Sequence, residues 1–138
     1  MINQLANLNW LSVAIAFVAY FILGALWFTV LFKKQYAISL GKENSLPEKP
    51  APIFIIGPVL CTLVITIANA ILFYALNIHS YGTALEFSFV VGIGYLVANT
   101  VNIAINPNIP NPIQYGIISG AYHLTGIVIV NVILTAMR

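Results

Sequence analysis

The sequence predicts an all-α fold, an integral membrane four-helix bundle whose helices run antiparallel in up-down-up-down order. Composition is the first observation behind this prediction. Of 138 residues, 61% are hydrophobic and 6% are charged, whereas soluble domains carry about 25% charged residues. A water-soluble fold with a mean hydropathy of +0.99 could not cover its surface with polar groups. The composition therefore excludes a soluble enzyme, a disordered chain and, because no basic face is present, a nucleic-acid partner.

Four long apolar stretches are the second observation. Crossing the roughly 30 Å hydrocarbon layer of a bilayer takes about 20 helical residues. None of the stretches contains Lys, Arg or Asp, and their one acid is Glu86. They also lack the alternation that is typical of membrane β-strands. We expect one membrane domain, residues 1–138, with spans over residues 10–32, 53–76, 85–105 and 113–137.

The connection after the first span, residues 33–52, sets the expected orientation. It holds four of the five basic residues, namely Lys33, Lys34, Lys42 and Lys49. The positive-inside rule therefore places this loop in the cytoplasm. We expect a multi-pass protein of the bacterial inner membrane with the N-terminus and the C-terminus outside.

The start of this loop predicts a short helix at the membrane surface. Phe32, Tyr36 and Leu40 recur every four residues, and the lysines Lys33 and Lys34 lie off that line. Such a helix turns its lysines toward anionic lipid headgroups, and Gly41 is a typical stop signal. The alternative interpretation is a polar turn without a partner.

Small residues mark the faces on which the helices should pack. Helices in lipid gain little by hiding Leu, so close backbone approach at glycine becomes important. The fourth span contains a Gly-x-x-x-Gly motif, and we expect its glycine face to meet a neighbouring helix in the same chain or in another copy. The expected packing residues are Gly24, Gly92, Gly116, Gly120 and Gly126.

Polar side chains within the spans predict a layer near the middle of the membrane. At 1.5 Å per residue, His123 lies roughly 15 Å from the inner end of the fourth span. Counting the neighbouring spans to that depth gives a layer of His123, Asn99, Tyr95, Thr62 and Thr66. A polar stripe adds Asn102 and Asn106 on the third span and Asn69 on the second.

His123 has two interpretations. As a structural residue it is a neutral imidazole, bonded to Asn or Tyr, that keeps the helices in register. As a functional residue it handles a proton or a solute, because ionisable groups that deep mark transport pathways. Glu86 is explained by a first-turn position, where a carboxylate interacts well with the helix dipole.

The residue types give no reason to expect a metal or a cofactor. The chain has one cysteine, Cys61, in an apolar run, and His79 lies alone in a short loop. A metal site or a disulfide framework needs more such ligands.

Motifs at both ends of the chain resemble those of a known family. They are Asn9-Trp10-Leu11, Gly24-Ala25-Leu26-Trp27-Phe28 with Leu31-Phe32-Lys33, and Gly120-Ala121-Tyr122-His123. In these the chain is similar to the small bacterial membrane proteins called domain of unknown function 1761. It departs from them in the third loop, where Asn106 to Pro112 replaces a charged turn. The resemblance covers nearly the whole chain and implies a four-helix membrane protein, but it implies no activity.

Two functions remain open. We expect no enzymatic activity, because acid–base catalysis needs a pair of positioned titratable groups and the spans offer none. The first is a structural or accessory bundle in the lipid bilayer that self-associates as a homo-oligomer or joins a larger membrane complex. The alternative is a small transporter or channel with a polar path lined by Asn99, Asn102, Asn106 and His123.

Overall fold

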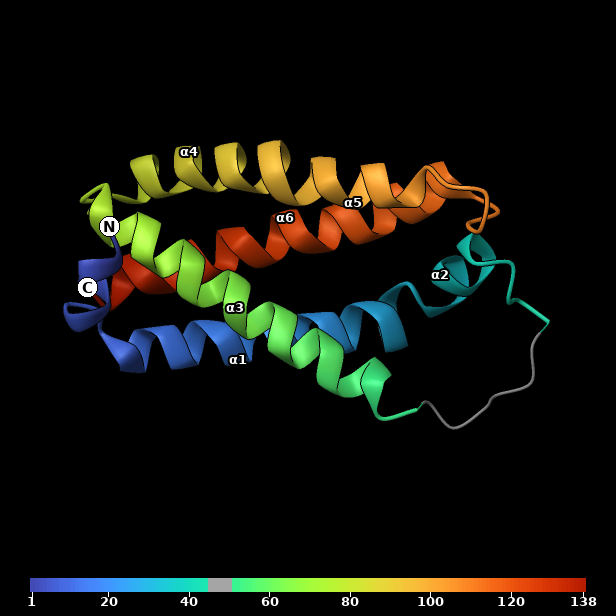
Figure 1. Cartoon of the computed structure of the whole chain (residues 1–138), viewed down its shortest axis with the longest axis horizontal. Coiled ribbons are helices and arrows are strands. Elements are labelled where there is room, and N and C mark those ends of the chain that lie inside the picture. The colour runs from blue at the N-terminus through green and yellow to red at the C-terminus, as the bar shows by residue number, and fades with distance from the viewer. Residues whose placement is uncertain (45–50) are drawn as a thin grey trace.

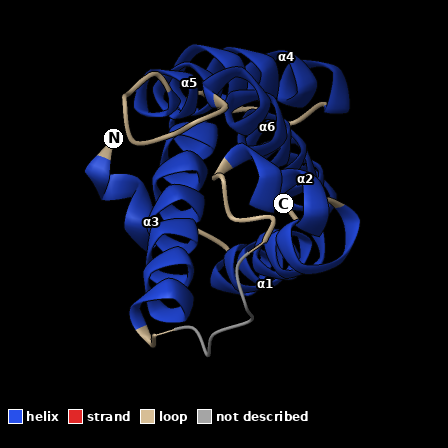
Figure 2. Ribbon diagram, turned by 90° about the vertical axis from the view of Figure 1, so that its right-hand side faces the viewer, coloured by secondary structure: helices blue, strands red, loops and turns tan. Residues whose placement is uncertain are grey.

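The computed structural model describes residues 1–44 and 51–138, so Lys49 lies outside the described residues. All regular secondary structure in the described part is helical (Figure 2), which confirms the all-α prediction. Within these ranges, four helical segments are long and apolar enough to cross a membrane. The chain is therefore a multi-pass membrane protein.

Two of the four spans contain a π-helical segment. The first span is α1 (Trp10–Leu26) followed by the π segment η2 (Trp27–Leu31). The second is α3 (Ile53–Ala75). The third consists of α4 (Tyr81–Val91), the π segment η3 (Gly92–Val97) and α5 (Ala98–Ala104). The fourth is α6 (Pro112–Ala136), and two short elements, η1 (Ile2–Ala6) and α2 (Lys33–Ser39), complete the chain.

The third span begins at Tyr81, whereas the sequence predicted a start at residue 85. Ser80 is its N-cap, and the Ser80 hydroxyl accepts a hydrogen bond from the Thr83 backbone N–H at 3.2 Å. Such a cap satisfies one of the free N–H groups that begin a helix. Glu86 therefore lies in the second turn, exposed, and the first-turn explanation of this carboxylate is wrong.

Figure 1 shows the chain reversing direction from each long helix to the next, with α6 between α1 and the α4–α5 pair. The central place of α6 is visible in its burial. Half of its most apolar window is buried (50%), against 17% to 22% for the other three spans. Because α6 touches every other span, its side chains decide how the bundle fits together.

Glycines allow the close approaches to α6, all within one chain. A Cβ at Gly120 would lie 3.1 Å from Val97 Cγ1, and one at Gly116 would lie 3.2 Å from Val101 Cγ2. A Cβ at Gly126 would overlap the ring of Tyr20. Gly24 and Gly92 are similarly close to Tyr122 and Leu124. The predicted glycine faces are thus covered inside the monomer.

Both termini lie at the same end of the bundle (Figure 1). Asn9 caps α1 through its side-chain oxygen, and its Nδ2 donates to the Met137 carbonyl at 2.8 Å. Arg138 donates to the Ile78 carbonyl at 2.5 Å, and its guanidinium lies 4.4 Å from the ring centroid of Tyr74. These contacts join the start of α1 to the ends of α3 and α6.

The opposite end carries the short amphipathic helix α2. Lys33 and Lys34 are exposed, whereas Tyr36 on the other side is half-buried. Asn111 fixes α2 to the start of α6, because its Nδ2 donates to the Ile38 carbonyl at 2.9 Å. Gly41 ends the element with a positive φ of 65°.

Candidate functional site

The centre of the bundle holds a hydrogen bond between Tyr20 and His123. The Tyr20 hydroxyl lies 2.7 Å from His123 Nδ1, and the two rings meet edge to face. Tyr20 is fully buried, and Gly126 next to it on α6 makes room for its ring. His123 therefore bonds to a tyrosine, as its structural interpretation expects, but that tyrosine comes from the first span.

Hydrogen-bond balance assigns the imidazole tautomer. Among the described residues, His123 is the only hydrogen-bond partner of the Tyr20 hydroxyl. A buried hydroxyl that failed to donate would carry a desolvation cost. Tyr20 therefore donates to Nδ1, and the proton of the neutral imidazole lies on Nε2, which remains free to donate.

The other residues of the predicted layer lie apart. Tyr95 is 71% exposed and points away from the bundle. Thr66 is buried and donates to the Thr62 carbonyl on its own helix at 2.8 Å. Only Thr62 and Asn99 share a site with His123, because all three line one cavity of about 520 Å³ between α3, α5 and α6.

A second polar layer links α3, α4 and α6. The sequence pointed to Asn69 but not to Asn131 or Ser88. Asn69 Nδ2 on α3 donates to Asn131 Oδ1 on α6 at 2.6 Å. Asn131 Nδ2 then donates to Ser88 Oγ on α4 at 2.8 Å, and Ser88 donates to the Ala84 carbonyl at 2.7 Å. All three polar side chains are at least 97% buried, since Asn69 is 3% exposed and the other two 0%. This chain of donors fixes the register of the three helices.

The predicted asparagine stripe lies on the outer face of the third span. Val97 and Val101 point at the glycines of α6. Asn99 is two residues from each of them, about 200° around the helix at 3.6 residues per turn. Asn99 and Asn102 are both exposed. Asn106, just after α5, is half-buried, and its Nδ2 donates back to the Ile103 carbonyl in the last turn of that helix. The stripe is neither a continuous path through the bundle nor a contact within it.

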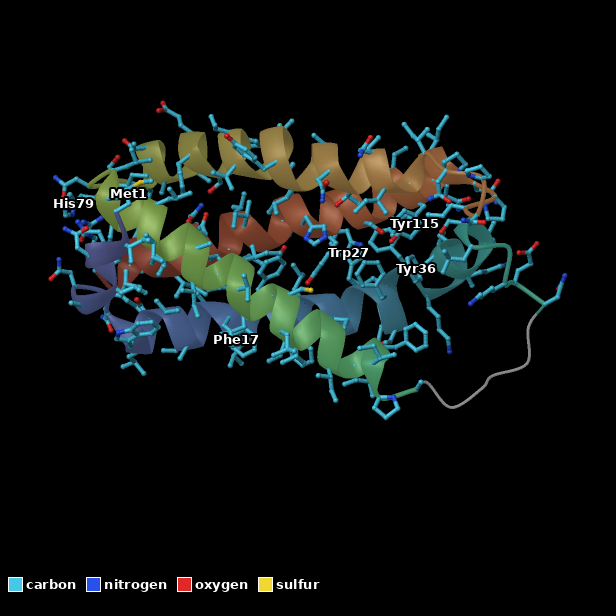
Figure 3. The ribbon with its side chains drawn as sticks, in the orientation of Figure 1. Met1, Phe17, Trp27, Tyr36, His79 and Tyr115 are labelled. Atoms are coloured by element: carbon cyan, nitrogen blue, oxygen red, sulfur yellow. The ribbon has the colours of Figure 1, made fainter. Side chains whose placement is uncertain are left out.

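Aromatic side chains surround the end of the cavity near α2. Figure 3 shows Trp27, Tyr36 and Tyr115 together on this side, with His79 at the far end of the bundle. The Trp27 indole N–H donates to the Ile118 carbonyl of α6 at 3.0 Å. Burial, and secondarily the neighbouring Tyr115, raise the pKa of Tyr36 to about 12. The Tyr36 hydroxyl is therefore protonated and can donate a hydrogen bond at physiological pH.

The family comparison fits this architecture. Residues 11–135 match a family model described as "Protein of unknown function (DUF1761)". The chain belongs to the DUF1761 family. This membership confirms the resemblance seen in the sequence motifs, and it brings no activity with it. Comparison with curated proteins and with solved structures finds no match. In the described part of this DUF1761 chain, no three His, Cys, Asp or Glu side chains are grouped so that they could hold a metal ion.

Proposed function

We propose that this protein is a non-enzymatic subunit of a membrane homo-oligomer and that two copies meet through the outer face of the third span. The observation that carries the proposal is the exposure of Tyr95, Asn99 and Asn102 on one face of a membrane span. An amide that faces lipid has no hydrogen-bond partner, and leaving it so costs free energy. A second helix placed there would supply the missing partners.

The chemistry of the stripe favours a second copy of the same chain as the partner. A carboxamide carries both a donor and an acceptor, so two identical amides can bond to each other across a two-fold axis. An isologous interface of this kind places each patch against itself. The glycine faces are already occupied within the monomer, which leaves the amide face as the best-equipped surface for association.

The outer face of the third span allows a direct test in the membrane. We replace Cys61 by Ser, introduce Ala98→Cys, and measure disulfide-linked dimers in native lipid after mild oxidation. Ala98 is exposed one turn before Asn102 on the same face, so this variant keeps the amides of Asn99 and Asn102. Val64→Cys in the same background is the matched control, because Val64 is 65% exposed on the outer side of α3. We expect dimers for the first variant and none for the second. Equal crosslinking of both, or of neither, contradicts the interface.

A sizing experiment gives the complementary readout. Asn102 is exposed, and its amide makes no hydrogen bond to any other described residue. Asn102→Leu should therefore leave the protein folded but make it sediment as a monomer in mild detergent. If the parent protein is itself a monomer in native lipid and in detergent, self-association is wrong, and the accessory role in a larger complex takes its place.

The orientation in an inner membrane belongs to the same proposal. Lys33, Lys34 and Lys42 gather at one end of the bundle, and both termini lie at the other. The positive-inside rule then leaves the termini outside. A reporter fused after Arg138 should be active only in the periplasm, and neutral substitutions of the three lysines should weaken that preference. Cytoplasmic activity of the fusion overturns the orientation.

The transporter alternative finds partial support in the structure. Asn99 and His123 line the same cavity, but Asn102 and Asn106 do not line it. A pH-dependent flux through liposomes that His123→Gln abolishes without unfolding the protein would favour transport over the structural role.

A further inference from the structure

The cavity beside His123 has the dimensions of a ligand site. Its volume of about 520 Å³ lies within the range of roughly 300–1,000 Å³ that is typical of small-molecule pockets. Helix α3 contributes Cys61 and Thr62, α5 contributes Asn99, and α6 contributes Ser119 and His123. Each of these three helices therefore supplies a polar side chain.

Ser119 carries one of two buried polar atoms that find no hydrogen-bond partner among the described residues; the other is Asn69 Oδ1, in the layer around Asn131. Ser119 is 5% exposed, and of these two residues it is the one that lines the cavity. Hydroxyl side chains inside helices commonly donate to the carbonyl four residues earlier. Five others within the spans do so, namely Thr29, Thr66, Ser88, Thr100 and Thr135. An unbonded hydroxyl buried against a cavity is a donor that a ligand would satisfy.

His123 supplies a second donor one turn away on the same helix. Residues at i and i+4 lie about 5–6 Å apart, so the Ser119 hydroxyl and the His123 imidazole face the cavity as a pair. Because Tyr20 donates to Nδ1, the free group of the imidazole is the Nε2–H donor. Two donors side by side call for a ligand with acceptor oxygens.

The rest of the lining defines the other properties of that ligand. None of the described residues that line the cavity carries a formal charge, so no ion pair would hold a charged ligand there. Phe28, Tyr36, Tyr115 and Tyr122 give the cavity aromatic walls, against which a planar ring packs well. At the mouth, Cys61 and Ile103 are exposed on the lipid-facing surface. A ligand would therefore enter from the bilayer.

We propose that this cavity binds an uncharged, membrane-soluble ring compound with carbonyl acceptors, the chemistry of a quinone head group. Its carbonyl oxygens accept hydrogen bonds from the Ser119 hydroxyl and His123 Nε2–H. Its ring packs against the tyrosines, and its apolar tail leaves between α3 and α5. The cavity shares Asn99 with the proposed oligomer face, but its two donors lie on α6, and Asn102, which the sizing experiment varies, does not line it.

Cys61 provides a built-in reporter because it is the only cysteine of the chain and lines the cavity. We measure the rate at which a maleimide labels Cys61 in lipid nanodiscs, with and without decyl-ubiquinone. The ring of this probe is fully substituted, so it does not add to thiols. At about ten times Kd the sites are roughly nine-tenths filled, and labelling should slow about tenfold. Val64→Cys with Cys61→Ser, outside the cavity, should label at an unchanged rate.

Two serine variants separate binding from folding. Ser119→Ala removes a donor that has no partner among the described residues, so thermal stability should hold or rise while the affinity for the quinone falls about five- to tenfold. Ser88→Ala breaks the layer around Asn131 and should show the reverse, with lower stability and unchanged affinity. The same alanine substitution is thus made at two buried serines with opposite expected results.

Three outcomes overturn the proposal. The first is the absence of protection of Cys61 by decyl-ubiquinone. The second is equal protection by decylbenzene, which has a similar shape but no carbonyl groups and would show a purely apolar groove. The third is an unchanged affinity in Ser119→Ala. The oligomer experiments are read by crosslinking and sizing, so failure of either proposal is recognised separately.

Discussion

Replacing His123 by Leu should destabilise the bundle through the loss of a partner for Tyr20. The Tyr20 hydroxyl is fully buried and lies 2.7 Å from His123 Nδ1. With Leu at position 123, it would stay buried without an acceptor, which costs about 1–3 kcal/mol. His123→Gln places an amide at the same position, which can accept the bond, so most of the stability should remain.

A double-mutant cycle isolates the bond itself. Tyr20→Phe removes the hydroxyl, and the double variant Tyr20→Phe/His123→Leu removes both partners. Hydrogen bonds between membrane helices contribute on average about 0.6 kcal/mol and at most about 1.7 kcal/mol by such cycles. We expect the upper part of that range, because Tyr20 is fully buried and His123 is its partner in the described chain.

The assay is reversible unfolding in mixed micelles with increasing denaturing detergent, followed by helix content. The reasoning is refuted if His123→Leu and His123→Gln unfold at the same detergent fraction, or if the coupling energy between the two positions is zero. Either result would mean that the hydroxyl finds another partner or that the two helices are not held by this bond.

Three further predictions concern packing, the second polar layer and pH. Gly126→Ala should prevent normal folding because its methyl group overlaps the Tyr20 ring. Gly57→Ala, whose methyl group would meet no described atom within 4 Å, should stabilise α3 by about 0.5–1 kcal/mol, and thermal melting compares the two variants. Asn131→Leu should lower the free energy of unfolding by about 2 kcal/mol or more, because it strands buried polar groups on two other helices, and an unchanged melting curve would contradict that layer. Burial raises the pKa of Tyr36 from 10.0 to about 12, so the stability that its neutral hydroxyl contributes is present below pH 10 and lost as the pH rises toward 12. The free energy of unfolding, measured from pH 10 to pH 12, should therefore fall less in Tyr36→Phe than in the parent protein.

The spans and the surface helix could be predicted from the sequence because their signals are local. Apolar length marks a membrane helix without knowledge of its neighbours. The four-residue spacing of Phe32, Tyr36 and Leu40 likewise identified α2, and Gly41 ended it. The start of the third span was placed too late because the turn at Tyr81 is less apolar than the helix it begins.

The partner of His123 could not be predicted, because depth alone does not say which side of a helix faces which neighbour. The count along the chain placed Tyr95 and Asn99 at the estimated depth of His123. The structure instead brings Tyr20 to the imidazole, since Gly126 opens the space for its ring on α6. Gly126 and Tyr20 were both visible in the sequence, but nothing there joins them. Asn131 and Ser88 were missed for the same reason.

The fate of the glycine motif decides what kind of contact an oligomer can use. Gly116 and Gly120 predicted close helix approach. In the structure, Gly116 packs against Val101 and Gly120 against Val97 of the same chain. This packing turns the opposite side of the third span outward and, with it, the amides of Asn99 and Asn102. The close packing within the chain and the exposed amides therefore both follow from how the third span is oriented about its own axis. A variant that loosened the first, such as Gly120→Leu, should also disturb the second, so its oligomer should weaken together with its monomer stability. Asn102→Leu should weaken the oligomer alone, and the difference between these two variants tests whether the amides form the interface.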